Sequence, residues 1–116
     1  MKHNNGLDDL LFLDGTVLVQ EFNFWVKIEA KRTKFFNIGR ANNIKYSLTL
    51  HNTKGERILG YDNSHKTVSG QKQFDHVHEF KTNKVKPYQF VSAEKLLVDF
   101  WLDVDKALTI ISQERK

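Results

Sequence analysis

Cysteine is absent from this chain of 116 residues, so disulfide frameworks, cysteine-based zinc sites and thiol nucleophiles are excluded. Long apolar runs are absent too, and no segment approaches the roughly 20 apolar residues that a membrane-spanning helix needs. The short apolar run at residues 10–13 follows Asp8 and Asp9, where a secretory signal would carry basic residues. We therefore expect a cytoplasmic protein that does not enter a membrane.

The sequence also lacks a glycine-rich phosphate loop, a nucleophile elbow, a dinucleotide fingerprint and internal repeats. Its length suits one domain, because two domains of half this size would each lack a proper core. We expect a single domain over residues 1–116, in which the polar residues 1–6 form a disordered tail.

Two-residue alternation of apolar and polar side chains, typical of half-buried β-strands, occurs at several places in the chain. Around the hairpin signal Asn52–Gly55, it predicts one strand before the turn and a returning strand after it. Residues 10–13 are expected to pair back, across the turn at Asp14 and Gly15, onto a long strand that bends midway. The predicted strands are residues 16–30, 44–51, 56–62, 75–80 and 88–91.

The last quarter of the chain shows the three- and four-residue spacing of an amphipathic helix. Ser92 is the expected N-cap, and Glu94 in the first turn favours the positive end of the helix dipole. The helix must cover the apolar face of the sheet, because neither element buries its apolar side chains alone. The sequence therefore predicts an α+β fold, with a mostly antiparallel sheet of five to six strands packed against one long C-terminal helix. The apolar helix positions are Leu96, Leu97, Phe100, Trp101, Val104, Leu108 and Ile111.

The net charge is +4, and the positive charge is concentrated between residues 27 and 45, where six basic residues oppose Glu29 alone. Such a cluster is a candidate binding surface for a polyanion or an acidic protein, and the alternative is a solvated loop that keeps the protein soluble. Phe35 and Phe36 lie beside the cluster and could stack on bases, although packing into the core is the alternative role for either ring. The candidate nucleic-acid-binding residues are Lys31, Arg32, Lys34, Arg40, Lys66 and Lys72.

Two histidines form the strongest candidate for chemistry. In a strand, His76 and His78 project from the same face about 6–7 Å apart, because side chains alternate and each residue rises about 3.3 Å. Histidine titrates near neutral pH, so this pair could act as general base and general acid on a phosphodiester. A nearby cation would neutralise the charge that develops on phosphorus. The candidate catalytic residues are Arg57, Asp62, Asp75, His76 and His78, with Lys66 and Lys72 as further cations.

Two other interpretations of the histidines stay open. The pair could hold a transition metal, with Asp62 or His65 completing the ligand set. The histidines could instead be structural and order the edge of a sheet through hydrogen bonds to the backbone. Asp62 and Asn63 likewise suit a turn in which their side chains bond to nearby backbone. We expect no cofactor.

Four short motifs, taken in order, resemble a known family. They are residues 55–63, 75–78, 87–90 and 96–100, and the resemblance runs over residues 46–108. This set is similar to the TumE-type family, whose members are small proteins described as toxins of type II toxin–antitoxin pairs. The motif residues shared with that family are Arg57, Gly60, Asp62, Asn63, Asp75, His76 and His78.

The resemblance implies a cytoplasmic prokaryotic protein whose partner is an antitoxin, often a helix-turn-helix regulator. Three hypotheses follow. The first is a toxin that cleaves RNA without a metal, and the second is a non-catalytic module that binds protein or nucleic acid. The third is a metal-dependent nuclease or hydrolase that uses Asp62, His65, His76 and His78. The sequence leaves open whether the chain forms a homo-oligomer.

Overall fold

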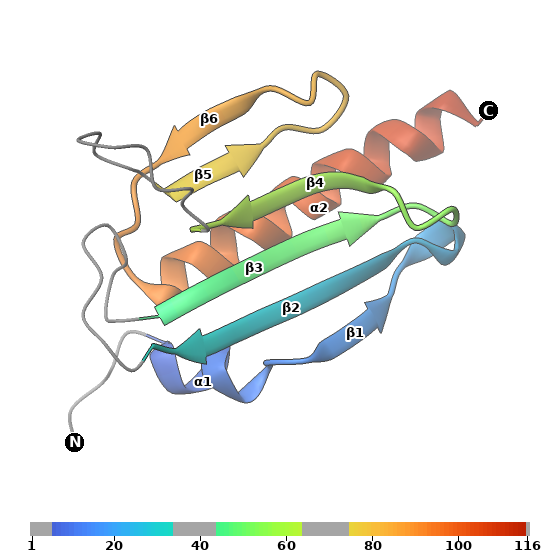
Figure 1. Ribbon diagram of the computed structural model, residues 1–116. Coiled ribbons are helices and arrows are strands. Elements are labelled where there is room, and N and C mark those ends of the chain that lie inside the picture. The colour runs from blue at the N-terminus through green and yellow to red at the C-terminus, as the bar shows by residue number, and fades with distance from the viewer. Residues whose placement is uncertain (1–5, 34–43, 64–74, 116) are drawn as a thin grey trace.

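The computed structural model describes residues 6–33, 44–63 and 75–115 (Figure 1). One antiparallel sheet has its six strands in the order of the chain, and a long helix crosses one of its faces. The predicted α+β architecture is confirmed. The elements are α1 (Leu7–Phe12), β1 (Thr16–Val19), the 3-10 turn η1 (Glu21–Asn23), β2 (Trp25–Arg32), β3 (Ile44–His51), β4 (Arg57–Asp62), β5 (Asp75–His78), β6 (Val85–Tyr88) and α2 (Ala93–Glu114).

The core lies between the sheet and the two helices. Alternate residues of β2 and β3 point into it, and α1 packs beside α2 over the same face of the sheet. Because of this alternation, the intervening polar residues of these strands all point to the other side of the sheet. The core side chains of the sheet and the helices are Leu10, Phe24, Val26, Ile28, Ala30, Ile44, Tyr46, Leu48, Leu50, Leu59, Tyr61, Ala93, Leu96, Phe100, Val104, Ala107, Leu108 and Ile111.

Helix α2 begins where the sequence predicts. The hydroxyl of Ser92 accepts a hydrogen bond from the backbone N–H of Lys95 at 3.0 Å, which satisfies one of the unpaired donors of the first turn. Five of the seven predicted apolar positions are buried, and Leu97 and Trp101 are partly buried against the core. The strand β3 and the hairpin to β4 also lie where they were predicted.

The single long strand predicted over residues 16–30 is wrong, because the chain reverses between β1 and β2. Phe22 and Asn23 both adopt φ near 61°, and the N–H of Phe24 donates to the carbonyl of Glu21 at 3.1 Å. Left-handed backbone is uncommon for phenylalanine, and no glycine marks this segment as a tight turn. The sequence therefore carries no signal for the reversal. The guanidinium of Arg115 lies 4.5 Å from the centre of the Phe22 ring and holds the turn against the end of α2.

The predicted hairpin arm at residues 10–13 is wrong as well, since residues 7–12 form α1. Leu7, Leu10 and Leu11 recur at helical spacing and pack on the core, which a strand over four residues would not achieve. The final strand, predicted at 88–91, instead spans Val85–Tyr88 at the edge of the sheet, and β5 ends at His78. Pro87 therefore lies within an edge strand, where its missing N–H is tolerated.

Each of the three tyrosines donates a hydrogen bond to an aspartate. Tyr46 bonds to Asp75 at 2.7 Å, Tyr88 bonds to Asp99 at 2.7 Å, and Tyr61 bonds to Asp103. Burial and the adjacent carboxylates raise the pKa of all three phenols well above the usual value, so the hydroxyls stay protonated. Two of these bonds join the sheet to α2, and the third joins β3 to β5 beneath β4.

Candidate active site on the open face of the sheet

The face of the sheet opposite α2 carries polar side chains in cross-strand rows. The strand register places Glu29, Ser47, Asp62 and His76 side by side on four neighbouring strands. Neighbouring strands lie about 4.8 Å apart, so side chains in one row can touch. The next row contains His78, opposite Gly60 of β4. We call this surface the open face.

Asp62 joins the two histidines at the centre of the open face. Its Oδ1 lies 3.1 Å from Nε2 of His76, and its Oδ2 lies 3.2 Å from Nε2 of His78. The imidazole centres are 5.9 Å apart and their planes are nearly perpendicular, at 86°. The side chains are 13% exposed for Asp62, 22% for His76 and 16% for His78, so they are shielded but reachable from solvent. The structure thus brings together three of the predicted residues, and the two imidazoles share a face, slightly closer than the predicted separation of about 6–7 Å.

Arg57 joins this group because of an irregularity in β4. The register shifts between Leu50 and His51, so that Arg57 lies opposite His51 on the open face. The arginine stem then passes over Gly60, where a Cβ atom would lie 3.3 Å from Cδ of Arg57. Its Nη2 donates to Nδ1 of His78 at 3.1 Å. The absence of a side chain at Gly60 therefore lets Arg57 reach the histidine pair.

These contacts assign the proton of His78. The Arg57 guanidinium has only donors, so Nδ1 of His78 accepts, and its Nε2 carries the proton that bonds to Asp62. Burial lowers the pKa of His78, the charge of Arg57 lowers it further, and Asp62 opposes both effects. His78 is therefore held as a neutral imidazole at neutral pH.

Asp75 and Asn63 lie apart from this group, on the covered side of the sheet. Asp75 is 5% exposed and accepts the hydrogen bond of the Tyr46 hydroxyl. Asn63 is fully buried, accepts from the backbone N–H of Tyr46 at 2.9 Å and donates to the carbonyl of Ile44 at 2.6 Å. The motif residues are thus divided between a polar group on one face of the sheet and buried hydrogen bonds on the other.

The basic residues predicted to bind nucleic acid are described only in part. Lys31 and Arg32 lie at the end of β2, and Lys31 forms an ion pair with Asp14 at 2.8 Å. The other predicted contacts, together with the alternative ligand His65 and the pair Phe35 and Phe36, lie outside the described residues. Within residues 6–33, 44–63 and 75–115, no group of three or more histidine, aspartate or glutamate side chains is arranged to hold a metal ion. The predicted contacts outside this range are Lys34, Arg40, Lys66 and Lys72.

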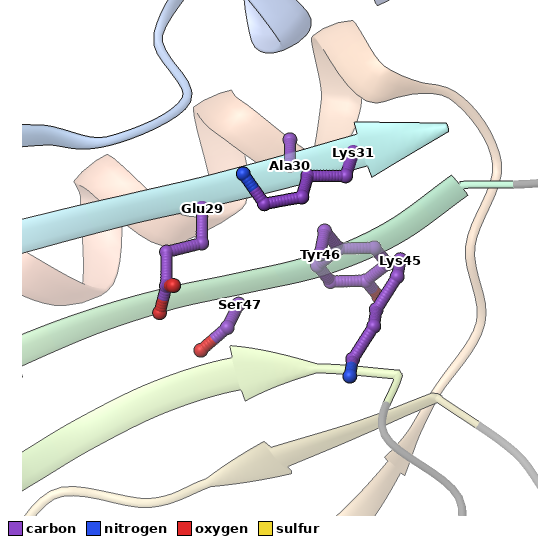
Figure 2. A pocket seen from close by; sticks show the side chains of 6 residues that line it. All are labelled: Glu29, Ala30, Lys31, Lys45, Tyr46 and Ser47. Carbon is purple, nitrogen blue, oxygen red and sulfur yellow. The ribbon is translucent and has the colours of Figure 1, made fainter. Parts of the chain in front are cut away.

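A pocket of about 300 Å³ lies on β2 and β3 and includes Glu29 and Ser47 from the row of Asp62 (Figure 2). Lys45 and Ser47 line it: Lys45 is the last of the six basic residues between positions 27 and 45, whereas the sequence suggested no site role for Ser47. Both belong to the polar half of the alternation in β3, which any solvated strand face would show. The pairing register of β3 and β4, with its shift between Leu50 and His51, places Ser47 directly opposite Asp62. The complete lining is Glu29, Ala30, Lys31, Lys45, Tyr46 and Ser47.

Fold and site together define a small α+β protein with an Asp-bridged histidine pair on the sheet face that the described helices leave open. The family model described as "Toxin TumE" matches residues 11–108, most of the chain. The chain therefore belongs to the TumE toxin family, and this membership implies an antitoxin as partner. No curated protein and no solved structure matches it. In the part of the chain that the structure describes, no helix is long and apolar enough to cross a membrane.

Proposed function

We propose that this toxin cleaves RNA in the cytoplasm as a metal-independent endoribonuclease. The observation that carries the proposal is the carboxylate of Asp62 bound to two imidazoles on the open face. One carboxylate that orients two histidines, with an arginine beside them, supplies the groups that phosphodiester cleavage needs. Its partner would be an antitoxin of the helix-turn-helix type, and a homo-oligomer is compatible with the open face.

The chemistry needs one group that accepts a proton and one that donates it. The base takes the proton of the ribose 2′-hydroxyl, a bond forms between O2′ and phosphorus, and the bond from phosphorus to O5′ breaks. The acid gives its proton to O5′, so the products are a 2′,3′-cyclic phosphate and a free 5′-hydroxyl. The neutral His78 is suited to be the base, and His76 is then the acid.

The other predicted residues take supporting roles in this proposal. A phosphate that draws Arg57 towards its oxygens frees Nδ1 of His78 to accept the proton, and Arg57 then stabilises the charge on phosphorus. Asp62 orients both rings. Asp75, at the buried start of β5, accepts a hydrogen bond from Tyr46 of β3 and so helps to fix the position of β5, which carries both histidines. The predicted basic residues attract the RNA by charge: Lys31, Arg32, Lys34, Arg40, Lys66 and Lys72.

The test uses purified protein and single-stranded RNA in buffer that contains a chelator. We expect fragments that end in a 2′,3′-cyclic phosphate, and a loss of about 10²- to 10⁴-fold in rate for His76→Ala or His78→Ala. His51→Ala is the matched control, because His51 lies on the same face but bonds to Thr49 and Gly55. Equal loss in the control, or full activity in both site variants, would contradict the assignment.

A non-catalytic binding module is the second candidate. It is favoured by the fact that both ring nitrogens of His78 have partners within the protein, an arrangement that also suits a structural histidine. In this case the RNA stays intact, and the toxin forms a stable complex with its target. Weaker binding at higher salt would then identify phosphate contacts.

A further inference from the structure

The pocket that contains Lys45 and Ser47 adjoins the histidine group, on the side away from the edge strand β6. Ser47 lies opposite Asp62 in the strand register, and Lys45 lies opposite Lys31 at the end of β2. In the view of Figure 2 the polar ends of Lys45 and Ser47 point across β3 towards β4. A group held here would lie about one strand spacing, roughly 5 Å, from the carboxylate of Asp62.

Charge in this pocket is concentrated on Lys45. Lys31 is paired with Asp14 at 2.8 Å, and Glu29 lies 3.9 Å from Lys27. Lys45 is exposed and forms no ion pair among residues 6–33, 44–63 and 75–115. An ammonium group with a hydroxyl beside it can bind a phosphate through charge and hydrogen bonds.

We propose that Lys45 and Ser47 bind a phosphate of single-stranded RNA that neighbours the phosphate to be cleaved. This inference rests on the proposed function, since it places the scissile phosphate at the histidine pair. The ammonium of Lys45 contacts the phosphate oxygens, and the Ser47 hydroxyl donates a hydrogen bond to them. Glu29 repels a second phosphate at its end of the pocket, so the bound strand runs from Lys45 towards β4 and the histidines.

Binding is measured with a short, mixed-sequence RNA in which every 2′-hydroxyl is replaced by fluorine, because this probe lacks the nucleophile and stays intact. For Lys45→Ala we expect the slope of log K against log salt to fall by about 0.7, the value for one phosphate contact on a single strand. At about 0.1 M salt this corresponds to a loss of about fivefold in affinity.

Lys106→Ala is the matched control. It removes the same charge from an exposed position on α2, which crosses the opposite face of the sheet. We expect its affinity and salt slope to stay at the wild-type values. Ser47→Ala should weaken binding with an unchanged slope, because it removes a hydrogen bond and no charge.

The outcomes separate this inference from the proposed function. Wild-type binding and slope in Lys45→Ala would overturn the phosphate site and leave cleavage at the histidines untouched. The expected loss in a protein that never cleaves normal RNA would support the site and contradict the endoribonuclease. No binding of RNA by the wild type would overturn both. Loss of antitoxin binding alone in Lys45→Ala would assign the pocket to an acidic protein surface and overturn the proposal.

Discussion

At the scale of single residues, Asp62 and Arg57 hold the two histidine rings in place through hydrogen bonds. Asp62 accepts a hydrogen bond from each ring, and Arg57 occupies the remaining nitrogen of His78. The residue types could be chosen from the sequence, and so could the shared face of the two histidines. The contact of Arg57 could not, because it depends on a register shift in β4 and on free space above Gly60.

Arg57→Gln should raise the pKa of His78. The substitution removes the positive charge that lowers this pKa, whereas Asp62 continues to favour the protonated ring. The measurement is an NMR titration of the histidine ring protons, and Lys54→Gln in the hairpin turn is the control for a lost charge at a distance. An unchanged pKa in Arg57→Gln would show that Arg57 does not act on His78.

The same contact affects stability at low pH. Because the pKa of His78 is lower in the folded protein than in the unfolded chain, the unfolded chain binds the proton more readily. The contribution of His78 to stability is therefore full above a pH of about 6.5 and is lost as the pH falls towards the folded pKa. In Arg57→Gln this dependence on pH should flatten, which denaturant unfolding at several pH values would reveal.

At the scale of elements, local signals decided how well the sequence could be interpreted. The hairpin of β3 and β4 and the start of α2 were predicted, since Asn52–Gly55 and Ser92 carry well-known turn and cap chemistry. The reversal between β1 and β2 was missed, because it uses Phe22 and Asn23 with left-handed backbone and no glycine. Its stabilising contact with Arg115 joins residues from opposite ends of the chain, which local patterns do not reveal.

Tyr46→Phe should destabilise the sheet by about 1–3 kcal/mol, because it removes a hydrogen bond to the buried carboxylate of Asp75. This bond joins β3 to β5 beneath β4. Tyr88→Phe is the control, and its cost should be smaller because Tyr88 is partly exposed at the edge strand. Chemical denaturation gives both values. An equal or greater cost for Tyr88→Phe would contradict the role assigned to the bond of Tyr46.

At the scale of the whole molecule, the two faces of one sheet differ in the side chains that they carry. Helices α1 and α2 cover one face and form the core, and the open face carries the histidine group and the pocket of Lys45 (Figures 1 and 2). The strands follow one another in order, so on the open face Asp62 and the two histidines become neighbours across the adjacent strands β4 and β5. Membership of the TumE toxin family supports a role for this chain as a toxin.

The most direct measurement of the central claim is growth and total RNA after induced expression of the wild type and of His78→Ala, with His51→Ala as control. We predict growth arrest with discrete RNA fragments for the wild type and the control, both suppressed by the antitoxin. His78→Ala should be folded, harmless and without fragments. Arrest by His78→Ala equal to that of the wild type, or arrest by the wild type with intact RNA, would contradict cleavage at the Asp62-bridged histidine pair.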